Sequence, residues 1–241
     1  MENIDLVIFD FFKTIARPIK PEECGIKKFI NDVYELLVEQ KRKDDISVDY
    51  IRNAFYDTIG FYEKMREISL FEVPVDVLIK TFTSRLGIFD QGETHKILKM
   101  YTDRLAEINE IYDDAREILK YLKNRGYKIC LLSNVQQYHY IDKVLGDSGV
   151  KNLFDMIFYS SDIGIRKPHP HIFDYVLDRM DTSSENALMV GDNFVADFYG
   201  AIMAGLHAIL IVRKKEEFSR LSIYIRKGKI IRNLLELKKF L

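Results

Sequence analysis

The sequence predicts a doubly wound parallel α/β sheet, with a helical domain inserted after its first strand. Two observations carry this prediction. Short apolar or β-branched runs alternate with amphipathic helical patterns over most of the chain, and one long segment near the N-terminus contains helical patterns only. We therefore expect an α/β core at residues 1–19 and 109–241 and a helical insertion at residues 20–108.

Five short runs are the expected strands of the core. They are IDLVIF (4–9), KICLLS (128–133), MIFYS (156–160), ALMV (187–190) and AILIV (208–212). The patterns DDAREILKYLKN (113–124) and PHIFDYVLDRM (170–180) between the later runs are typical of helices. A parallel sheet is the simplest arrangement, because helical crossovers can return the chain to begin each new strand at the same end.

The segment from 20 to 108 shows no strand pattern, and its apolar residues recur at helical spacing. Three stripes stand out: Phe29, Val33, Leu36 and Leu37; Ile51, Phe55, Ile59 and Tyr62; and Ile97, Leu98, Tyr101 and Leu105. Such stripes more often form the core of a helical bundle than a cofactor or lipid surface. The charged run KRKDD, 41–45, is expected to be a solvated turn between two of the helices.

Composition argues against several classes of protein. The 36 Lys and Arg residues nearly balance the 37 Asp and Glu residues, which disfavours a dominant surface for nucleic acid or anionic membrane. No apolar stretch is long enough to span a bilayer, and the N-terminus is too acidic for a signal peptide, so we expect a cytoplasmic protein. Cys24 and Cys130 lie too far apart to suggest a disulfide framework or a zinc site. Oligomeric state cannot be read from these features.

Polar residues follow the expected strands or occupy the loops after them. In open parallel α/β sheets, ligands bind beyond the carboxyl ends of the strands. The four clusters are Asp10 with Thr14, Ser133 with Asn134, Arg166 with Lys167, and Gly191 with Asp192, Asn193 and Asp197. Each alone is typical of a turn or a helix cap. Together they supply a carboxylate nucleophile, donors for phosphoryl oxygens, a cation and oxygen ligands for Mg²⁺, which are the groups that phosphoryl transfer requires.

These clusters resemble the motifs of the haloacid dehalogenase superfamily of hydrolases. The matching pieces, in the family's order, are FDFFKT, LLSN, RKP and GDNFVAD, and the helical insertion resembles the family's mobile cap. The resemblance implies a Rossmann-like core and a small-molecule substrate, most often phosphorylated. It covers nearly the whole chain, but it does not identify the substrate, since the family uses one core for many reactions.

The resemblance also implies a role for each matching residue. Asp10 would attack the substrate and form a covalent aspartyl intermediate, and Ser133 and Lys167 would hold the phosphoryl oxygens. Thr14 would hydrogen-bond near the nucleophile, and Asn134 is a candidate for substrate binding.

Magnesium binding is implied in the same way. The ligands would be Asp10, the backbone carbonyl of Phe12 and Asp192, with Asp197 helping directly or through water. Asn193 is a secondary candidate of the same motif.

Phe12 departs from the family's phosphatase pattern, and it leaves three functions open. Most phosphatases of the family carry an aspartate at this position that protonates the leaving alcohol, and a small residue where Lys13 stands. We expect a Mg²⁺-dependent phosphatase whose substrate has a leaving group that needs no protonation, with Phe12 against the substrate. A metal-independent 2-haloacid dehalogenase is the first alternative, because that branch has an aromatic residue here, and Arg42 falls roughly where it places a halide-binding arginine.

The second alternative is a catalytically weak protein that binds phosphate or a partner. The retention of Gly191, Asp192 and Asp197 weighs against the dehalogenase, because three converging carboxylates are costly without a cation.

Overall fold

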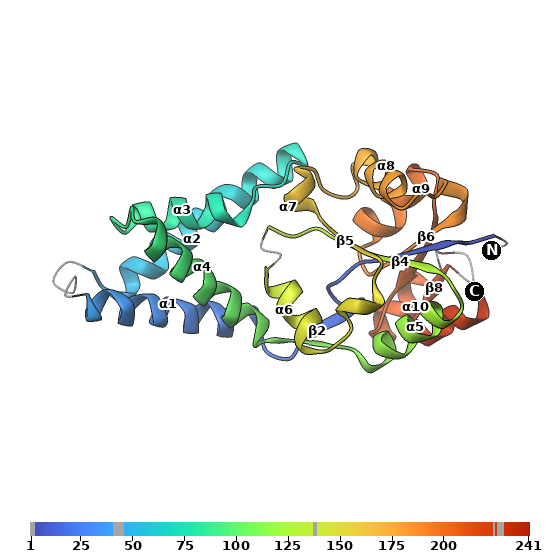
Figure 1. Ribbon diagram of the computed structural model, residues 1–241, viewed down its shortest axis with the longest axis horizontal. Coiled ribbons are helices and arrows are strands. Elements are labelled where there is room, and N and C mark those ends of the chain that lie inside the picture. Colours follow the sequence, from blue (N-terminus) through green and yellow to red (C-terminus); the bar gives the residue numbers. More distant parts are fainter. Residues whose placement is uncertain (1–2, 41–45, 137–138, 224, 226–228) are drawn as a thin grey trace.

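A computed structural model describes residues 3–40, 46–136, 139–223, 225 and 229–241 of the chain. Four helices, α1 to α4, gather at one end of the molecule, and a twisted sheet with its covering helices forms the other end (Figure 1). Both chain termini lie at the sheet end (Figure 1).

The sheet has six parallel strands in the order β5-β4-β1-β6-β7-β8. Their bounds are β1 Leu6–Phe9, β4 Lys128–Ser133, β5 Met156–Tyr159, β6 Ala187–Gly191, β7 His207–Ile211 and β8 Ile230–Ile231. The prediction of a doubly wound parallel sheet is confirmed, and five strands fall where the apolar runs predict them. The sequence analysis missed β8, because a two-residue strand gives no measurable pattern.

The two faces of the sheet are covered by different helices, because alternate side chains of a strand point to opposite faces. Val7 and Phe9 pack with α5, Asp113–Asn124, and α6, His139–Asp147, while Leu6 and Ile8 pack with α8, Pro170–Arg179, and α9, Gly200–Met203. Figure 1 shows α5 and α8 on opposite sides of the sheet. Buried on both faces, the central strands have to be continuously apolar, as their sequences are.

The helical insertion comprises α1 Glu22–Glu39, α2 Val48–Ser69, α3 Val75–Arg85 and α4 Gln91–Ala106 in the described part of the chain. Its predicted helical character is confirmed. Phe29, Phe55 and Tyr101, from three helices, meet with ring centroids 5.1–5.5 Å apart, and Phe82 of α3 joins them. The apolar stripes are therefore the core of a bundle, as predicted. The predicted turn at 41–45, with Arg42, lies outside the described residues.

A short antiparallel ribbon carries the chain between the sheet and the bundle. It pairs β2, Ala16–Pro18, with β3, Asn109–Ile111, and the backbone N–H of Ile19 donates to the carbonyl of Ile108. The two crossings of the chain therefore run side by side, next to the proposed domain limits at 20 and 108. Those limits stay a prediction. The ribbon was not predicted, because its three-residue strands are too short to show alternation.

The remaining elements connect or flank the sheet. They are α7 Ser160–Ile163, α10 Lys215–Leu221, the 3₁₀ helices η2 Lys151–Leu153, η3 Ser184–Asn186 and η5 Leu234–Lys239, and the π-helix η4 Phe194–Tyr199. Among the helices described, none is both long and apolar enough to cross a membrane.

Candidate active site

Three neighbouring strands bring the candidate residues together. Asp10 follows β1, Asn134 follows β4 and Asp192 follows β6, and β1 lies between the other two in the sheet. The strands are parallel, so all three carboxyl ends meet at one edge. The backbone N–H of Asp10 donates to the carbonyl of Val190 at 2.9 Å, which extends the ladder up to the candidate nucleophile. The sequence prediction of a common site at this edge agrees with this placement.

Lys167 lies at the centre of the site, with its side chain 1% exposed. Its ammonium donates to Asp10 Oδ1 at 2.9 Å, to Asp197 Oδ1 at 2.6 Å and to the carbonyl of Leu132 at 2.7 Å. Burial would lower the pKa of this lysine, but the two carboxylates raise the pKa above its ordinary value. Because an ammonium has three donors and all are used, Lys167 is held as a charged group in one orientation.

Asn134 fixes the loop that carries Lys167. Its side-chain amide donates to the carbonyl of Lys167, and its oxygen accepts the backbone N–H of Lys167, both at 2.8 Å. The loop lies between α7 and α8, far from Asn134 in the sequence. This reciprocal pair aligns the end of β4 with the lysine. Both polar ends of the Asn134 side chain are thereby engaged with the protein.

The carboxylate of Asp197 is also fully engaged. Its Oδ1 accepts from Lys167, and its Oδ2 accepts the backbone N–H of Asn193 at 2.9 Å. The Asn193 side chain caps the π-helix by accepting from the backbone N–H groups of Val195 and Ala196. Asp197 packs directly on Gly191, where an added Cβ would lie 2.2 Å from Asp197 Oδ2. Only glycine at position 191 lets this carboxylate reach the lysine.

Asp10, Asp192 and Asp197 form a cluster whose members each offer a carboxylate oxygen within 4.8 Å of the others. Burial raises the pKa of Asp10, Lys167 opposes the rise, and Asp197 and Asp192 add to it; together they bring this pKa from 3.8 to about 7. Burial and Asp197 likewise raise the pKa of Asp192 to about 6. Burial is the main cause of both shifts, and the neighbouring carboxylates add to it because three of them lie close to one ammonium. Hard carboxylate oxygens at this spacing suit Mg²⁺, so the residues fit the expected metal.

A cavity of about 450 Å³ opens over the cluster. Asp10, Phe12 and Lys167 line it from the side of the sheet. Arg66 and Leu70 line it from the end of α2. The other lining residues are Lys13, Asn134, Arg166, Asp192, Asn193, Val195, Ala196 and Asp197. Both the sheet and the inserted bundle thus contribute to one cavity, whose size suits a small molecule.

Phe12 is half-buried, and its ring packs edge-on against Phe11 with centroids 5.0 Å apart. Tyr140 of α6 lies beside it, with ring centroids 6.0 Å apart. Lys13 follows with a left-handed φ of 52°, a conformation that favours glycine, and its ammonium lies 3.8 Å from Asp192 Oδ2. At this point of the cavity wall, the side chain is an aromatic ring that cannot exchange a proton.

Ser133 and Thr14 are not among the residues that line the cavity. Both are fully buried, and within the described residues neither hydroxyl oxygen has a hydrogen-bond partner. A buried hydroxyl without a hydrogen-bond partner costs free energy. Each of these two hydroxyls can therefore still form a hydrogen bond with a group in the site. The predicted substrate contact of Ser133 stays a prediction.

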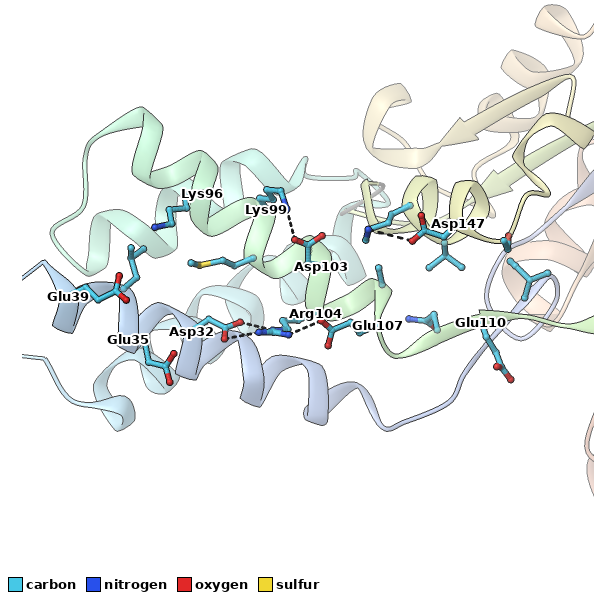
Figure 2. Close-up of a pocket in the computed structure, with 18 of the residues that line it drawn as sticks. Asp32, Glu35, Glu39, Lys96, Lys99, Asp103, Arg104, Glu107, Glu110 and Asp147 are labelled. Carbon is cyan, nitrogen blue, oxygen red and sulfur yellow. Dashed lines mark hydrogen bonds and ion pairs between the residues drawn. The ribbon is translucent and has the colours of Figure 1, made fainter.

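A larger hollow of about 1090 Å³ lies elsewhere, between α1, α4 and α6 (Figure 2). Figure 2 shows charged side chains along it, many of them in ion pairs: Arg104 binds Asp32 at 2.6 Å and Lys99 binds Asp103 at 2.6 Å. None of the predicted site residues lines it. We therefore assign the candidate site to the smaller cavity, where unneutralised carboxylates and a buried lysine meet.

The sequence analysis did not anticipate the contribution of Arg66. This residue stands in the stretch EKMREI on α2, where alternating charges are typical of a solvated helix face. Glu72, which is 5% exposed, forms an ion pair with it at 2.7 Å. No local signal could have shown that this end of α2 faces the sheet, because the packing of the bundle against the core decides it.

Comparisons with known proteins point to one family. A family model described as haloacid dehalogenase-like hydrolase matches residues 4–205. Among curated relatives, a glyceraldehyde 3-phosphate phosphatase of Methanothermobacter thermautotrophicus is 33% identical over 41% of this chain and 43% of that protein. Haloacid dehalogenase-like hydrolase domain-containing protein 3 of Homo sapiens is 30% identical over 57% of this chain and 55% of that protein. The chain thus spans about half the length of these relatives.

Other similarities extend over most of the chain. Pyrophosphatase PpaX of Bacillus cereus is 25% identical over 84% of this chain and 81% of that protein. The crystal structure of a HAD phosphatase from Thermococcus onnurineus is 27% identical, with a TM-score of 0.65 over 98% of this chain and 97% of that chain. A 2-haloacid dehalogenase from Pseudomonas syringae gives a TM-score of 0.67 over 98% of this chain and 97% of that chain, but at 19% identity it shows the shared fold alone.

Proposed function

The chain belongs to the haloacid dehalogenase-like hydrolases, and we propose that it is a Mg²⁺-dependent phosphatase of a small phosphorylated molecule, with Asp10 as the nucleophile. Relatives whose names describe phosphatases of glyceraldehyde 3-phosphate, phosphoserine and pyrophosphate support phosphoryl transfer as the reaction class. The observation that carries the proposal is the contact of a buried, charged Lys167 with Asp10, beside two further carboxylates.

Asp10 is suited to attack because its two oxygens can be used differently. Lys167 holds Oδ1 at 2.9 Å, which orients the carboxylate and leaves Oδ2 for the substrate. Oδ2 would bond to phosphorus while the bond from phosphorus to the leaving oxygen breaks, and the leaving oxygen would take the electron pair. Water would then attack phosphorus, release inorganic phosphate and restore the carboxylate.

Lys167 would offset the charge of the transferred group, and Ser133 would bind one of its oxygens. The ammonium of Lys167 is buried and rigid, so it can offset developing negative charge without reorganising. The Ser133 hydroxyl, at the end of β4, is a buried donor without a partner among the described residues. Thr14, which is also buried without a hydrogen-bond partner among the described residues, would hydrogen-bond near the nucleophile loop.

The residues that would hold Mg²⁺ are Asp10, Asp192 and the backbone carbonyl of Phe12. Asp197 would help directly or through water, since Lys167 and Asn193 each donate to one of its oxygens and leave further lone pairs. Bound there, the ion would neutralise the crowded carboxylates and polarise a phosphoryl oxygen.

Phe12 restricts the leaving group. The ring lines the cavity but cannot protonate a departing alkoxide, so substrates whose leaving groups carry negative charge well should be favoured. Acyl and aryl phosphates meet this condition. The chain would therefore be a poor phosphatase of simple alkyl esters.

Dehalogenase chemistry is the second candidate, and Phe12 is the observation that favours it. A halide leaves without a proton, so an aromatic residue at position 12 suffices for that reaction. Against it stand the three carboxylates, because their converging negative charge would be costly in a reaction that uses no metal ion.

The test is a substrate panel of 4-nitrophenyl phosphate, acetyl phosphate, glycerol 3-phosphate and 2-chloropropionate, each assayed with Mg²⁺ and with a chelator. We expect Mg²⁺-stimulated release of phosphate from the first two. The control is Asp10→Asn, which should abolish release while the circular dichroism spectrum stays unchanged, since the amide is nearly isosteric but cannot attack.

Two results would contradict the proposal. Halide release that persists with the chelator would favour the dehalogenase, and no hydrolysis of any member would favour a protein that only binds phosphate or a partner.

A further inference from the structure

Two arginines stand where the inserted bundle meets the sheet, in the same cavity as Asp10 and Lys167. Arg66 comes from α2, and Arg166 immediately precedes the buried lysine. The reaction of a phosphate group at Asp10 uses neither of them, because Lys167 and the carboxylate cluster already supply its charges. Their presence calls for a ligand group of another kind.

Backbone contacts hold Arg166 at this position. Its N–H donates to the carbonyl of Leu70 at 3.1 Å, and the N–H of Glu72 donates to the carbonyl of Gly164 at 3.0 Å. Phe71 and Ile165 form an antiparallel bridge between these two bonds. The segment after α2 therefore pairs with the segment before Lys167, and Arg166 is fixed at the seam rather than on a free loop.

Among the described residues, the acidic side chain at this seam is Glu72, and it pairs with Arg66. Glu72 is buried, lies 2.7 Å from Arg66 Nε and accepts a hydrogen bond from Ser160 Oγ at 2.8 Å. Within the described part of the chain, the Arg166 guanidinium has no recorded hydrogen bond or ion pair. Burial and then the positive charge of Arg66 lower the pKa of Arg166, and the opposing effect of Glu72 does not cancel them.

We infer that the substrate carries a second anionic group, a carboxylate or a further phosphate, that binds Arg166 at the seam while the scissile phosphate lies at Asp10. The inference rests on the proposed function and narrows its substrate class. A guanidinium presents paired donors that match either anion, and the cavity of about 450 Å³ has room for a small doubly charged molecule. Arg66, held by Glu72, adds positive potential beside it.

The experiment measures binding, so that it does not depend on turnover. Asp10→Asn protein is titrated calorimetrically, in the presence of Mg²⁺, with glycerol 3-phosphate, 3-phosphoglycerate and glycerol 1,3-bisphosphate. The last two replace one hydroxyl end of the first by a carboxylate and by a phosphate. We expect at least one of them to bind about tenfold to a hundredfold more tightly than glycerol 3-phosphate, as a charge-assisted hydrogen bond supplies. Their order identifies which anion the site takes.

Variants of Arg166 test whether this side chain causes the difference in affinity. Arg166→Gln, added to the Asp10→Asn protein, should reduce the preference to less than about threefold, and Arg166→Lys should keep part of it, because the charge remains without the paired donors. Arg179→Gln on the exposed face of α8 is the matched control and should keep the full preference, since Arg179 does not line the cavity.

Equal affinity for the three ligands, or no measurable binding of any, would overturn the inference, as would a preference that survives Arg166→Gln. These outcomes are separate from a failure of the proposed function. The natural protein could hydrolyse no phosphate ester while the Arg166-dependent preference persists. In that case the inference about the second anion holds, and the proposed phosphatase activity is wrong.

Discussion

The ammonium of Lys167 is a buried charge with a fixed position beside the candidate nucleophile. It contacts two carboxylates and one backbone carbonyl, so its desolvation is offset by three short hydrogen bonds. The two carboxylates it contacts still carry an excess of negative charge together with Asp192. A site built this way attracts a second cation, which is why we place Mg²⁺ there.

Phe12 should make the enzyme depend on its leaving group. A positioned acid contributes about a hundredfold to ten-thousandfold to rate, so alkyl phosphates should react more slowly than aryl phosphates by a factor of that order. Water attack on the aspartyl intermediate should also be slow, giving a burst of product before steady turnover. Stopped-flow release of 4-nitrophenol would measure the burst.

Phe12→Asp adds the acid that the natural protein lacks at this position. It should raise turnover of glycerol 3-phosphate more than that of 4-nitrophenyl phosphate. Phe12→Leu is the control, because it removes the ring that packs on Phe11 and Tyr140 without adding a carboxylate. If alkyl and aryl esters react equally in the natural protein, another residue supplies the proton.

Gly191→Ala should separate Asp197 from Lys167. The new Cβ would lie 2.2–2.5 Å from the Asp197 carboxylate, closer than atoms can approach, so the carboxylate must shift. We expect phosphatase activity to fall at least about tenfold and the free energy of unfolding to fall by about 1–3 kcal/mol. Urea denaturation and steady-state assays measure the two effects, and Gly60→Ala, with open space around its position on α2, is the control. Unchanged activity would show that the position of Asp197 does not matter.

At the scale of elements, Arg213 joins three segments around the nucleophile loop. It follows β7 and donates to the carbonyls of Lys13 and Thr14 at 3.1 and 2.6 Å, and it binds both oxygens of Asp114 at 2.9 and 3.1 Å. Asp114 also accepts the backbone N–H of Leu234, at the start of η5. The loop after β1 is thereby connected to the first turn of α5 and to the C-terminal segment.

Arg213→Gln should lower the free energy of unfolding by about 2 kcal/mol, since it leaves a mostly buried Asp114 without its charged partner. Arg220→Gln on the exposed face of α10 should have no comparable effect. Thermal and urea unfolding of both variants would measure the difference. Equal stabilities would mean that the loop after Asp10 does not depend on this arginine.

At the scale of the whole molecule, the inserted bundle and the sheet meet through few polar contacts near the site. The buried Glu72 connects Arg66 of α2 with Ser160 of α7, beside the two backbone bonds of the seam. We expect the bundle to move relative to the sheet, because substrate must enter and water must then be excluded.

Hydrogen exchange at the amides of Glu72 and Arg166 would detect this motion, since both donate across the seam. Exchange there should slow when a phosphate analogue binds, and Glu72→Gln should accelerate it by weakening the ion pair. Glu63→Gln, an exposed change on α2, is the control. Exchange that is insensitive to both ligand and Glu72→Gln would argue for a fixed bundle.

Local patterns were enough for much of this molecule. Five of the strands and the helical character of the insertion follow from the apolar pattern. A strand buried on both faces is apolar throughout, and a helix buried along one stripe is apolar at helical spacing. The short strands β2, β3 and β8 escaped prediction, since two or three residues cannot display a period. Asp10, Asp192 and Lys167 could be grouped from the sequence because each follows a strand or occupies a loop at the same edge of a parallel sheet.

The fold class and the chemical groups of the candidate site could therefore be predicted without a structure, since both depend on residue types at short spacings. The tertiary structure sets how those groups divide their contacts: Lys167 donates to one oxygen of Asp10 and to one of Asp197, and Ser133 is buried outside the lining of the cavity. It also decided that Arg66 and Arg166 face one cavity. Residues one hundred positions apart are brought together by the packing of the bundle on the sheet, and no local pattern records that packing.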